Sequence, residues 1–277
     1  MLTATQFDRA RRLALRLAGI ELVERHRALL DRRCRRLGLA EESGIERLLH
    51  AAEVEDPAAS RRFVGLVTTR FTGWFRHPEH FALAAEHVRR KVEQRGEARV
   101  WSAGTATGEE AYSLAMAVIE ALCCEDPPVR ILATDIDAVA LAAAERGEYG
   151  ERALATLTPA RRVRFLAPAA QESRWRLAPA VRRLVEWRHL NLVSAAWHLA
   201  GPIDILFCRN VLMYLQTDCR GAVLTRMASL LAPDGVLFLD PAEHLGGAAP
   251  LFGPGVNSAH RRPGAPAWRN PSPSPEP

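Results

Sequence analysis

The sequence predicts an α/β protein in which a doubly wound, Rossmann-like domain follows a small all-α domain. Between about residues 98 and 246, short apolar runs alternate with segments of helical spacing, which is typical of a parallel sheet covered on both faces. Residues 1 to about 70 show helical spacing alone. Glycine, aspartate and an Arg-Asn pair directly follow three of the apolar runs, at the sheet edge where ligands bind.

The N-terminal region is expected to be a helical bundle. Leu13 and Leu17 recur at helical spacing, and Gly19 is suited to end their helix. Pro57 begins a further helix, because proline is favoured in a first helical turn. No alternating strand pattern interrupts these segments.

The Rossmann-like part is expected to contain four buried strands separated by helices. The predicted strands are 98–104, 129–137, 202–210 and 235–240, and the predicted helices are 109–123, a segment ending near 146, and 216–231. Residues 147–190 are less regular, and the alternation in their second half suits a hairpin or edge strands. We therefore divide the chain into a helical domain (1–75), a ligand-binding α/β domain (76–253) with a small β subdomain within 147–190, and a Pro/Gly-rich tail (254–277) expected to be disordered.

Composition predicts a cytoplasmic protein with no metal site. No apolar run approaches the ~20 residues of a membrane-spanning helix, and the N-terminus lacks a signal-peptide pattern, so no membrane insertion is expected. The five cysteines have no zinc-ligand spacing and are read as reduced thiols. The net charge of +5 suits an acidic partner, but a bias toward arginine explains it equally well. We therefore expect no nucleic-acid partner, and a monomer.

A glycine turn follows the first strand, where Gly104 and Gly108 allow the backbone to approach a ligand. The spacing G-x-x-x-G differs from the G-x-G-x-x-G of dinucleotide sites, and the turn lacks the Lys-Ser/Thr ending of a P-loop. An adenosine ligand without phosphates fits better, although an ordinary strand-to-helix turn explains the glycines as well.

Asp135 ends the next strand, where a carboxylate can accept hydrogen bonds from both ribose hydroxyls. Asp137 is better read as the N-cap of the following helix.

Two further segments carry polar side chains near the same edge. Asn210 follows a buried strand, and Tyr214 lies four residues later, on the same side if a helix starts early; a helix cap and a half-buried tyrosine are the simpler reading. Thr72 and Arg76 flank an aromatic pair that is suited to cover a cofactor or, equally, to form a hydrophobic hinge between domains.

These segments together resemble the CheR chemotaxis methyltransferases. SAGTATGEEAYSLAM is similar to the family's S-A-G-C-S/A-T-G-E-E-P-Y-S-I-A-M, DILFCRNVLMYL to D-x-I-F-C-R-N-V-L-I-Y-F, and TRFTGWFR to T-x-x-T-x-F-F-R. ATDID and LNLV also match family positions, and the resemblance covers about residues 7–246. It implies a class I methyltransferase fold that uses S-adenosylmethionine and releases S-adenosylhomocysteine.

The resemblance also implies roles for individual residues. Arg76 and Tyr214 are candidates to orient the acceptor carboxylate, with Tyr214 near the transferred methyl group. The implied cofactor contacts are Thr72, Arg76, Gly104, Glu109 or Glu110 (amino-acid or sulfonium part), Asp135 (ribose), Asn191 and Leu192 (adenine side), and Asn210 and Val211 (methionine side).

The implied substrates are glutamate side chains on acidic cytoplasmic helices of chemoreceptors. A glutamate is ionised at neutral pH, with an ordinary pKa of about 4.3, so it needs no general base to attack a sulfonium methyl group. Catalysis should then come from alignment and from desolvation in a closed cleft. The basic run Arg32, Arg33, Arg35 and Arg36 is suited to steer such a helix, although a solvated face explains it too.

Three departures from the family pattern favour a second reading. Arg70 replaces a frequent asparagine, Pro241 changes the turn before Glu243, and a Pro/Gly-rich tail stands where relatives have a further strand. A weakened homologue that binds cofactor or receptor without turnover is therefore the alternative. An RNA or small-molecule methylase is disfavoured by the lack of an Asn/Asp-Pro-Pro-Tyr/Phe motif, and a dehydrogenase by the glycine spacing.

Overall fold

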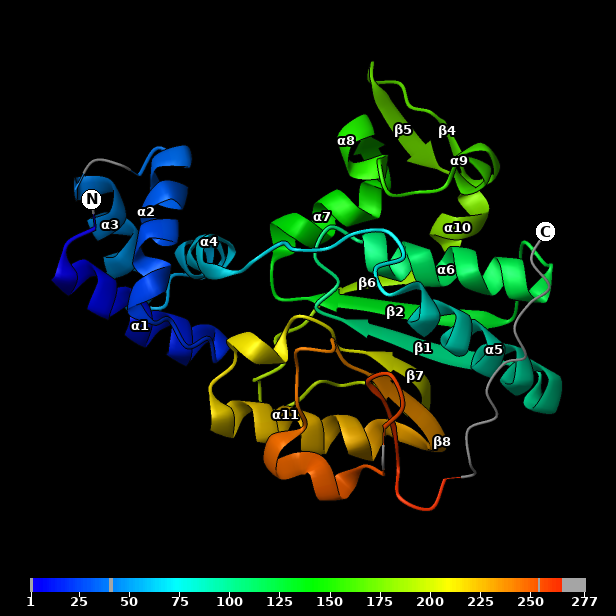
Figure 1. The fold of residues 1–277 in the computed structure, drawn as a ribbon. Coiled ribbons are helices and arrows are strands. Elements are labelled where there is room, and N and C mark those ends of the chain that lie inside the picture. Colours follow the sequence, from blue (N-terminus) through cyan, green and yellow to red (C-terminus); the bar gives the residue numbers. More distant parts are fainter. Residues whose placement is uncertain (1, 40–41, 254, 266–277) are drawn as a thin grey trace.

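The computed structural model describes residues 2–39, 42–253 and 255–265, and a mixed six-stranded sheet forms its centre (Figure 1). The strand order is β6-β2-β1-β7-β8-β9, with every pair parallel except β8 with β9. This confirms the predicted doubly wound architecture. The strands are β1 (Ala98–Ala103), β2 (Val129–Asp135), β6 (Val185–His189), β7 (Ile203–Phe207), β8 (Leu231–Phe238) and β9 (Ala259–Arg261).

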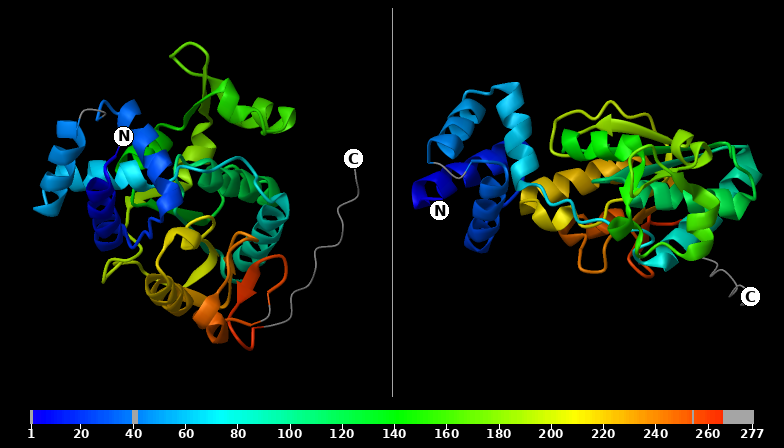
Figure 2. Two further views of the ribbon diagram at one scale, coloured as in Figure 1. Left: turned by 60° about the vertical axis from the view of Figure 1, so that its left-hand side comes forward. Right: turned by 90° about the horizontal axis from the view of Figure 1, so that it is seen from above.

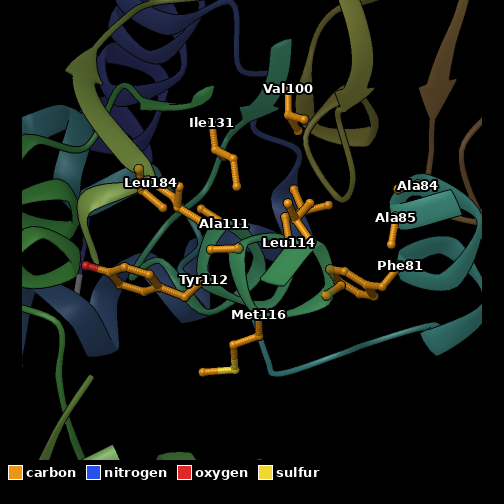
Figure 3. Packing of buried hydrophobic residues seen from close by; sticks show 14 of the residues in the cluster. Phe81, Ala84, Ala85, Val100, Ala111, Tyr112, Leu114, Met116, Ile131 and Leu184 are labelled. Carbon is orange, nitrogen blue, oxygen red and sulfur yellow. The ribbon is translucent and has the colours of Figure 1, made fainter. Parts of the chain in front are cut away.

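Helices cover both faces of this sheet, with α6 on one side and α11 on the other (Figure 1). The helices of this part are α5 (Pro78–Arg95), α6 (Glu109–Leu122), α7 (Ala138–Arg146) and α11 (Thr217–Leu230). Figure 3 shows Leu114 of α6 beside Val100 and Ile131 of the sheet, with Phe81 of α5 alongside. All four side chains are at most 1% exposed, so this core fixes how the strand ends are presented.

The N-terminal residues form the helical bundle that their spacing predicts. Its elements are α1 (Ala4–Ala18), the 3₁₀ turn η1 (Glu24–His26), α2 (Arg27–Arg36), α3 (Glu42–Glu53) and α4 (Pro57–Val67). The Thr3 hydroxyl caps α1 at its start, and Gly19 ends it in the left-handed conformation with φ 66°. Pro57 occupies the first turn of α4, as expected.

The bundle lies at the carboxyl ends of β1 and β2 (Figure 1), and Figure 2 shows it at one end of the α/β part from two further directions. The segment after α1 runs antiparallel to the segment before α11: Ile20 forms a β-bridge with Leu215, and the backbone nitrogen of Glu21 donates to the Tyr214 oxygen at 2.9 Å. The backbone nitrogen of Gln216 donates to the Gly19 oxygen, also at 2.9 Å. This junction places bundle residues at the ligand-binding edge of the sheet.

Residues 147–190 divide between two sheets. A three-stranded antiparallel sheet of order β3-β5-β4 stands apart from the central sheet, formed by β3 (Glu148–Gly150), β4 (Leu166–Pro168) and β5 (Arg174–Leu177). The short helices around it are α8 (Glu151–Leu154), α9 (Pro159–Phe165) and α10 (Pro179–Arg183). Strand β6 instead joins the central sheet as its edge, which explains why its sequence alternates rather than forming a continuous apolar run.

The expected disorder from residue 254 is corrected for residues 255–265, while 254 and 266–277 lie outside the described residues. Strand β9 pairs with β8, and Phe252 and Ala259 are buried. A 3₁₀ turn, η3 (Gly246–Leu251), leads into this segment. Pairing with β8 and the burial of Ala259 therefore accompany order in a segment whose average composition predicts disorder.

His87 on α5 leads to a prediction about acid stability. Its ring is 2% exposed, and neither ring nitrogen has a hydrogen-bond partner among the described residues. Burial lowers the pKa of His87 to about 3, against about 6.5 when unfolded. As the pH falls below about 6.5, His87 binds a proton in the unfolded chain but stays neutral in the folded chain. The free energy of unfolding is therefore highest above pH 6.5 and decreases progressively below it.

His87→Leu should therefore flatten the fall of unfolding free energy with pH by up to about 1.4 kcal/mol per pH unit between pH 6 and 4. Urea titrations at several pH values would measure this. His50→Leu at an exposed position serves as the control and should leave the slope unchanged. Equal slopes for His87→Leu and the unsubstituted chain would show that His87 protonates in the folded state.

Candidate functional site

A cavity lies where the bundle meets the carboxyl ends of β1, β2 and β7. Its walls come from both parts of the chain. From the bundle and the connection to α5 they are Ala18, Ile20, Val67, Thr68, Thr69 and Phe71; from the α/β part they are Gly104, Ala106, Asp135, Ile136, Leu190, Asn191, Leu192, Arg209, Asn210, Val211, Tyr214 and Leu215.

Gly104 shapes the floor of this cavity. Its φ is 79°, and a Cβ atom there would lie 2.2 Å from Cγ2 of Val211. The turn is fixed by a 2.8 Å hydrogen bond from the Gly104 nitrogen to the Thr134 oxygen. Any side chain at this position would therefore displace Val211 and strain the backbone.

Asp135 presents a carboxylate whose orientation the backbone fixes. One oxygen accepts from the Ala106 nitrogen at 2.7 Å and the other from the Asp137 nitrogen at 2.8 Å. Burial raises the pKa of Asp135, against the opposing effect of these hydrogen bonds. Because each carboxylate oxygen can accept a second hydrogen bond, the group keeps acceptor capacity for a ligand. Asp137 caps α7 as predicted, accepting from Val139 and Ala140.

The Asn210–Tyr214 segment is not the early helix that would place both side chains on one helical face. Asn210 adopts φ 59°, a 3₁₀ turn η2 (Leu212–Tyr214) follows, and α11 begins only at Thr217. Both residues line the cavity nonetheless.

Glu243 holds this segment and was not predicted as a site residue. Its Oε2 accepts from the nitrogens of Asn210 at 2.9 Å and Asp240 at 3.1 Å. Its Oε1 accepts from the nitrogens of Val211 at 2.9 Å and Met213 at 3.2 Å. Burial raises the pKa of Glu243, and the four backbone donors oppose that rise. The only sequence signal was the glutamate retained in Asp-Pro-Ala-Glu.

Arg209 connects the cavity to buried acidic groups. Its side chain is 2% exposed; one Nη donates to the Arg76 oxygen at 2.6 Å, and the other lies 3.5 Å from Glu110 Oε2. Ser102 donates to the other Glu110 oxygen at 2.8 Å. Burial raises the pKa of Glu110, and the charge of Arg209 lowers it in part.

Arg76 lies behind the cavity wall. Its Nη2 is 3.3 Å from Asp240 Oδ2, and its guanidinium lies 4.6 Å from the ring centre of Phe71, which faces the cavity. Although burial works to raise it, the pKa of Asp240 is lowered by hydrogen bonds from Ala242 and Asn210 and by the charge of Arg76.

The structure brings together most of the predicted site residues. Gly104, Asp135, Asn191, Leu192, Asn210, Val211 and Tyr214 line the cavity, whereas Thr72, Arg76, Glu109 and Glu110 do not. Glu109 is buried beside Thr107, whose hydroxyl donates to it at 2.7 Å, and burial raises its pKa. The cavity-lining residues of the bundle were not predicted, because their apolar spacing signals only helix packing.

A second cavity lies on the bundle side of Tyr214. Ile20, Val67, Thr69 and Tyr214 line both cavities; the remaining walls are Leu22, His26, Leu29, Leu30 and Arg33. Arg33 is fixed there by hydrogen bonds to the oxygens of Leu66 at 2.9 Å and Thr68 at 2.6 Å.

Within the described residues, no group of histidine, cysteine, aspartate or glutamate is arranged to hold a metal ion. In the same part of the chain, every helix is too short or too polar to cross a lipid bilayer.

Comparison with known proteins identifies close relatives. Residues 70–254 match the family model described as "CheR methyltransferase, SAM binding domain". The chain is 37% identical to "Chemotaxis protein methyltransferase 2" of Pseudomonas aeruginosa, covering 87% of both chains, and 34% identical to the "Chemotaxis protein methyltransferase" of Salmonella typhimurium, covering 88% of this chain and 85% of the relative. Among solved structures, the CcbJ methyltransferase of Streptomyces caelestis has a TM-score of 0.36 at 17% identity, covering 62% of this chain and 56% of the other.

Proposed function

This chain belongs to the CheR methyltransferase family and is an S-adenosylmethionine-dependent methyltransferase, and from that premise we propose that it methylates glutamate side chains on acidic cytoplasmic helices of chemoreceptors. The products are glutamate methyl ester and S-adenosylhomocysteine, and the enzyme acts as a cytoplasmic monomer. The observation that carries this proposal is the position of Tyr214 between two cavities, one suited to the cofactor and one bordered by the basic helix α2.

The residues that line the first cavity suit the chemistry of the cofactor. Asp135 keeps acceptor capacity for the ribose hydroxyls, and the side chains of Ile136, Leu190 and Leu192 offer an apolar surface for the adenine ring. Gly104 lets the side chain of Val211 pack closely against the backbone, and the methionine part would lie beside these two residues. When bound, the cofactor supplies a methyl group on a positively charged sulfur.

The reaction needs no general acid or base from the protein. With the cofactor bound, a carboxylate oxygen of the acceptor would form a bond to the methyl carbon as the S–CH₃ bond breaks, and the bonding electrons would stay on sulfur. Since the acceptor is already ionised, no proton has to move. The protein's contribution is alignment in a site that excludes water.

The second cavity is proposed as the acceptor's approach. Leu22, Leu29 and Leu30 provide apolar walls, while Arg33 and Tyr214 provide polar groups near the first cavity. Arg32, Arg35 and Arg36 are exposed on α2 and are placed to attract an acidic helix.

Tyr214 is the stronger candidate to orient the carboxylate, because it lines both cavities and Arg76 lines neither. Arg76 supports the wall through its contacts with Phe71 and Arg209. We therefore assign Arg76 to positioning and Tyr214 to contact with the acceptor.

The test is a transfer assay with S-adenosylmethionine that carries a tritiated methyl group and a purified chemoreceptor cytoplasmic fragment. Glutamate methyl esters release volatile methanol in base, whereas methylated nitrogen or RNA does not. Base-labile label that disappears when the acceptor glutamates are replaced by alanine would support the proposal. Binding of S-adenosylhomocysteine with no transfer would instead support the binding-module alternative.

Tyr214→Phe is expected to lower kcat by about 10- to 100-fold, because one hydrogen bond to a charged acceptor is lost in the transition state. The dissociation constant for S-adenosylhomocysteine should change less than about threefold, since Val211 and Asp135 remain in place. Initial rates combined with calorimetric titration separate the two effects. An unchanged kcat would remove Tyr214 from the reaction.

A further inference from the structure

An ion pair joins the connection between the two parts of the chain to the start of α7. Nε of Arg70 donates to Asp137 Oδ2 at 2.7 Å, and the Thr68 hydroxyl lies 3.4 Å from the same oxygen. The Asp137 side chain is 1% exposed, whereas that of Arg70 is 43% exposed. The buried member of the pair therefore depends on Arg70 for charge compensation.

Asp137 links this ion pair to the cofactor-side carboxylate. Its Oδ1 caps α7 through the nitrogens of Val139 and Ala140 at 3.0 and 3.1 Å. Its own backbone nitrogen donates to Asp135 Oδ1 at 2.8 Å. A shift of Asp137 would therefore change the orientation of Asp135.

The connection held by Arg70 is itself a wall of the cavity. Thr68, Thr69 and Phe71 all face it, on either side of Arg70. Arg33 binds the oxygens of Leu66 and Thr68 from the bundle side. Arg70 is therefore the charged contact of this wall with the α/β part.

We infer that Arg70 is a positioning residue for the cofactor. Its ion pair with Asp137 fixes the position of the 68–71 wall relative to the Asp135 carboxylate. This rests on the proposed placement of the cofactor in the first cavity. Arg70 touches no reacting atom in this assignment, and its effect passes through Asp137 and the wall. Removing either member of the ion pair, or both, should consequently lower cofactor affinity by about the same factor.

A double-mutant cycle tests this with Arg70→Ala, Asp137→Asn and the double variant. Asparagine keeps one oxygen to cap α7, but its NH₂ group replaces the oxygen that accepts from Arg70, so the variant removes both the charge and the acceptor of the ion pair. The cycle then measures the coupling between positions 70 and 137. Each single change is expected to weaken S-adenosylhomocysteine binding about tenfold, and the double variant should be no weaker than either single variant. Arg70→Lys should recover part of the affinity, while kcat at saturating cofactor stays within about twofold.

Arg183→Ala is the control, because this exposed arginine pairs with Asp126 at 3.2 Å, and the two residues precede β6 and β2, at the opposite ends of these strands from the cavity. It should leave the affinity unchanged. The inference is overturned if Arg70→Ala binds within twofold of the unsubstituted chain, or if the two single effects multiply to about a hundredfold. It is also overturned if these variants lose only thermal stability. Failure of the unsubstituted chain to bind would instead refute the proposed cofactor site.

Discussion

Asp135→Asn is expected to weaken S-adenosylhomocysteine binding by at least about a hundredfold, because two hydrogen bonds from the ligand to a charged acceptor are lost. Both Asp135 oxygens already accept backbone N–H groups, from Ala106 and Asp137. An amide nitrogen in place of either oxygen would face a donor, so the side chain must rotate and the ribose contacts go with it. Isothermal titration of the folded variant measures the effect.

The pH dependence of binding gives a second view of the same group. Because burial raises the pKa of Asp135, its carboxylate is protonated at a higher pH than an ordinary aspartate. Affinity should fall as the pH is lowered through that raised pKa. Asp126→Asn, at an exposed surface ion pair, is the matched control for both measurements. Affinity within threefold of the unsubstituted chain for Asp135→Asn would place the ribose elsewhere.

Glu243→Ala is expected to cost about 3–5 kcal/mol of unfolding free energy and to abolish detectable cofactor binding. The change leaves four backbone N–H groups without their acceptor, and three of them belong to Asn210, Val211 and Met213. The loop that carries Tyr214 would then lose the conformation in which Asn210 has its positive φ. Urea unfolding and calorimetric titration report the two effects separately.

Glu243→Gln provides the graded comparison. Its single oxygen can serve one of the two pairs of donors, so stability and affinity should fall between those of Glu243→Ala and the unsubstituted chain. Glu186→Ala, at a surface ion pair with Arg188, should stay within about 0.5 kcal/mol. Equal stability of Glu243→Ala and the unsubstituted chain would mean that the loop is held by its own turn geometry.

The parts of the fold that could be predicted are those where one local signal decides the structure. Short, largely apolar runs identified β1, β2 and β7, and the polar residues that follow them located the ligand-binding edge. The helix cap at Asp137 followed from its position between a strand and an alanine-rich segment. Such signals act within a few residues and are independent of the rest of the chain.

The features that could not be predicted depend on contacts between distant residues. Glu243 accepts a hydrogen bond from Asn210, 33 positions earlier in the chain, and no local sequence pattern near either residue predicts this contact. Strand β9 has three residues and follows a glycine-rich stretch. The average composition of this segment therefore predicted disorder, although a few of its side chains are buried. Ala18 and Ile20 lie in a segment whose apolar pattern is satisfied by bundle packing, which conceals their second role in the cavity.

The antiparallel contact between Gly19–Glu21 and Tyr214–Gln216 has a consequence for protein engineering. The family model begins at residue 70. Nevertheless, the cavity that contains Asp135 is also lined by five residues from the preceding part of the chain: Ala18, Ile20, Val67, Thr68 and Thr69. A chimera that exchanges the helical part with a relative to redirect receptor choice would also exchange one wall of the cofactor cavity. A graft that keeps residues 18–21 and 67–71 from this chain preserves the cavity while replacing the face presented by α2.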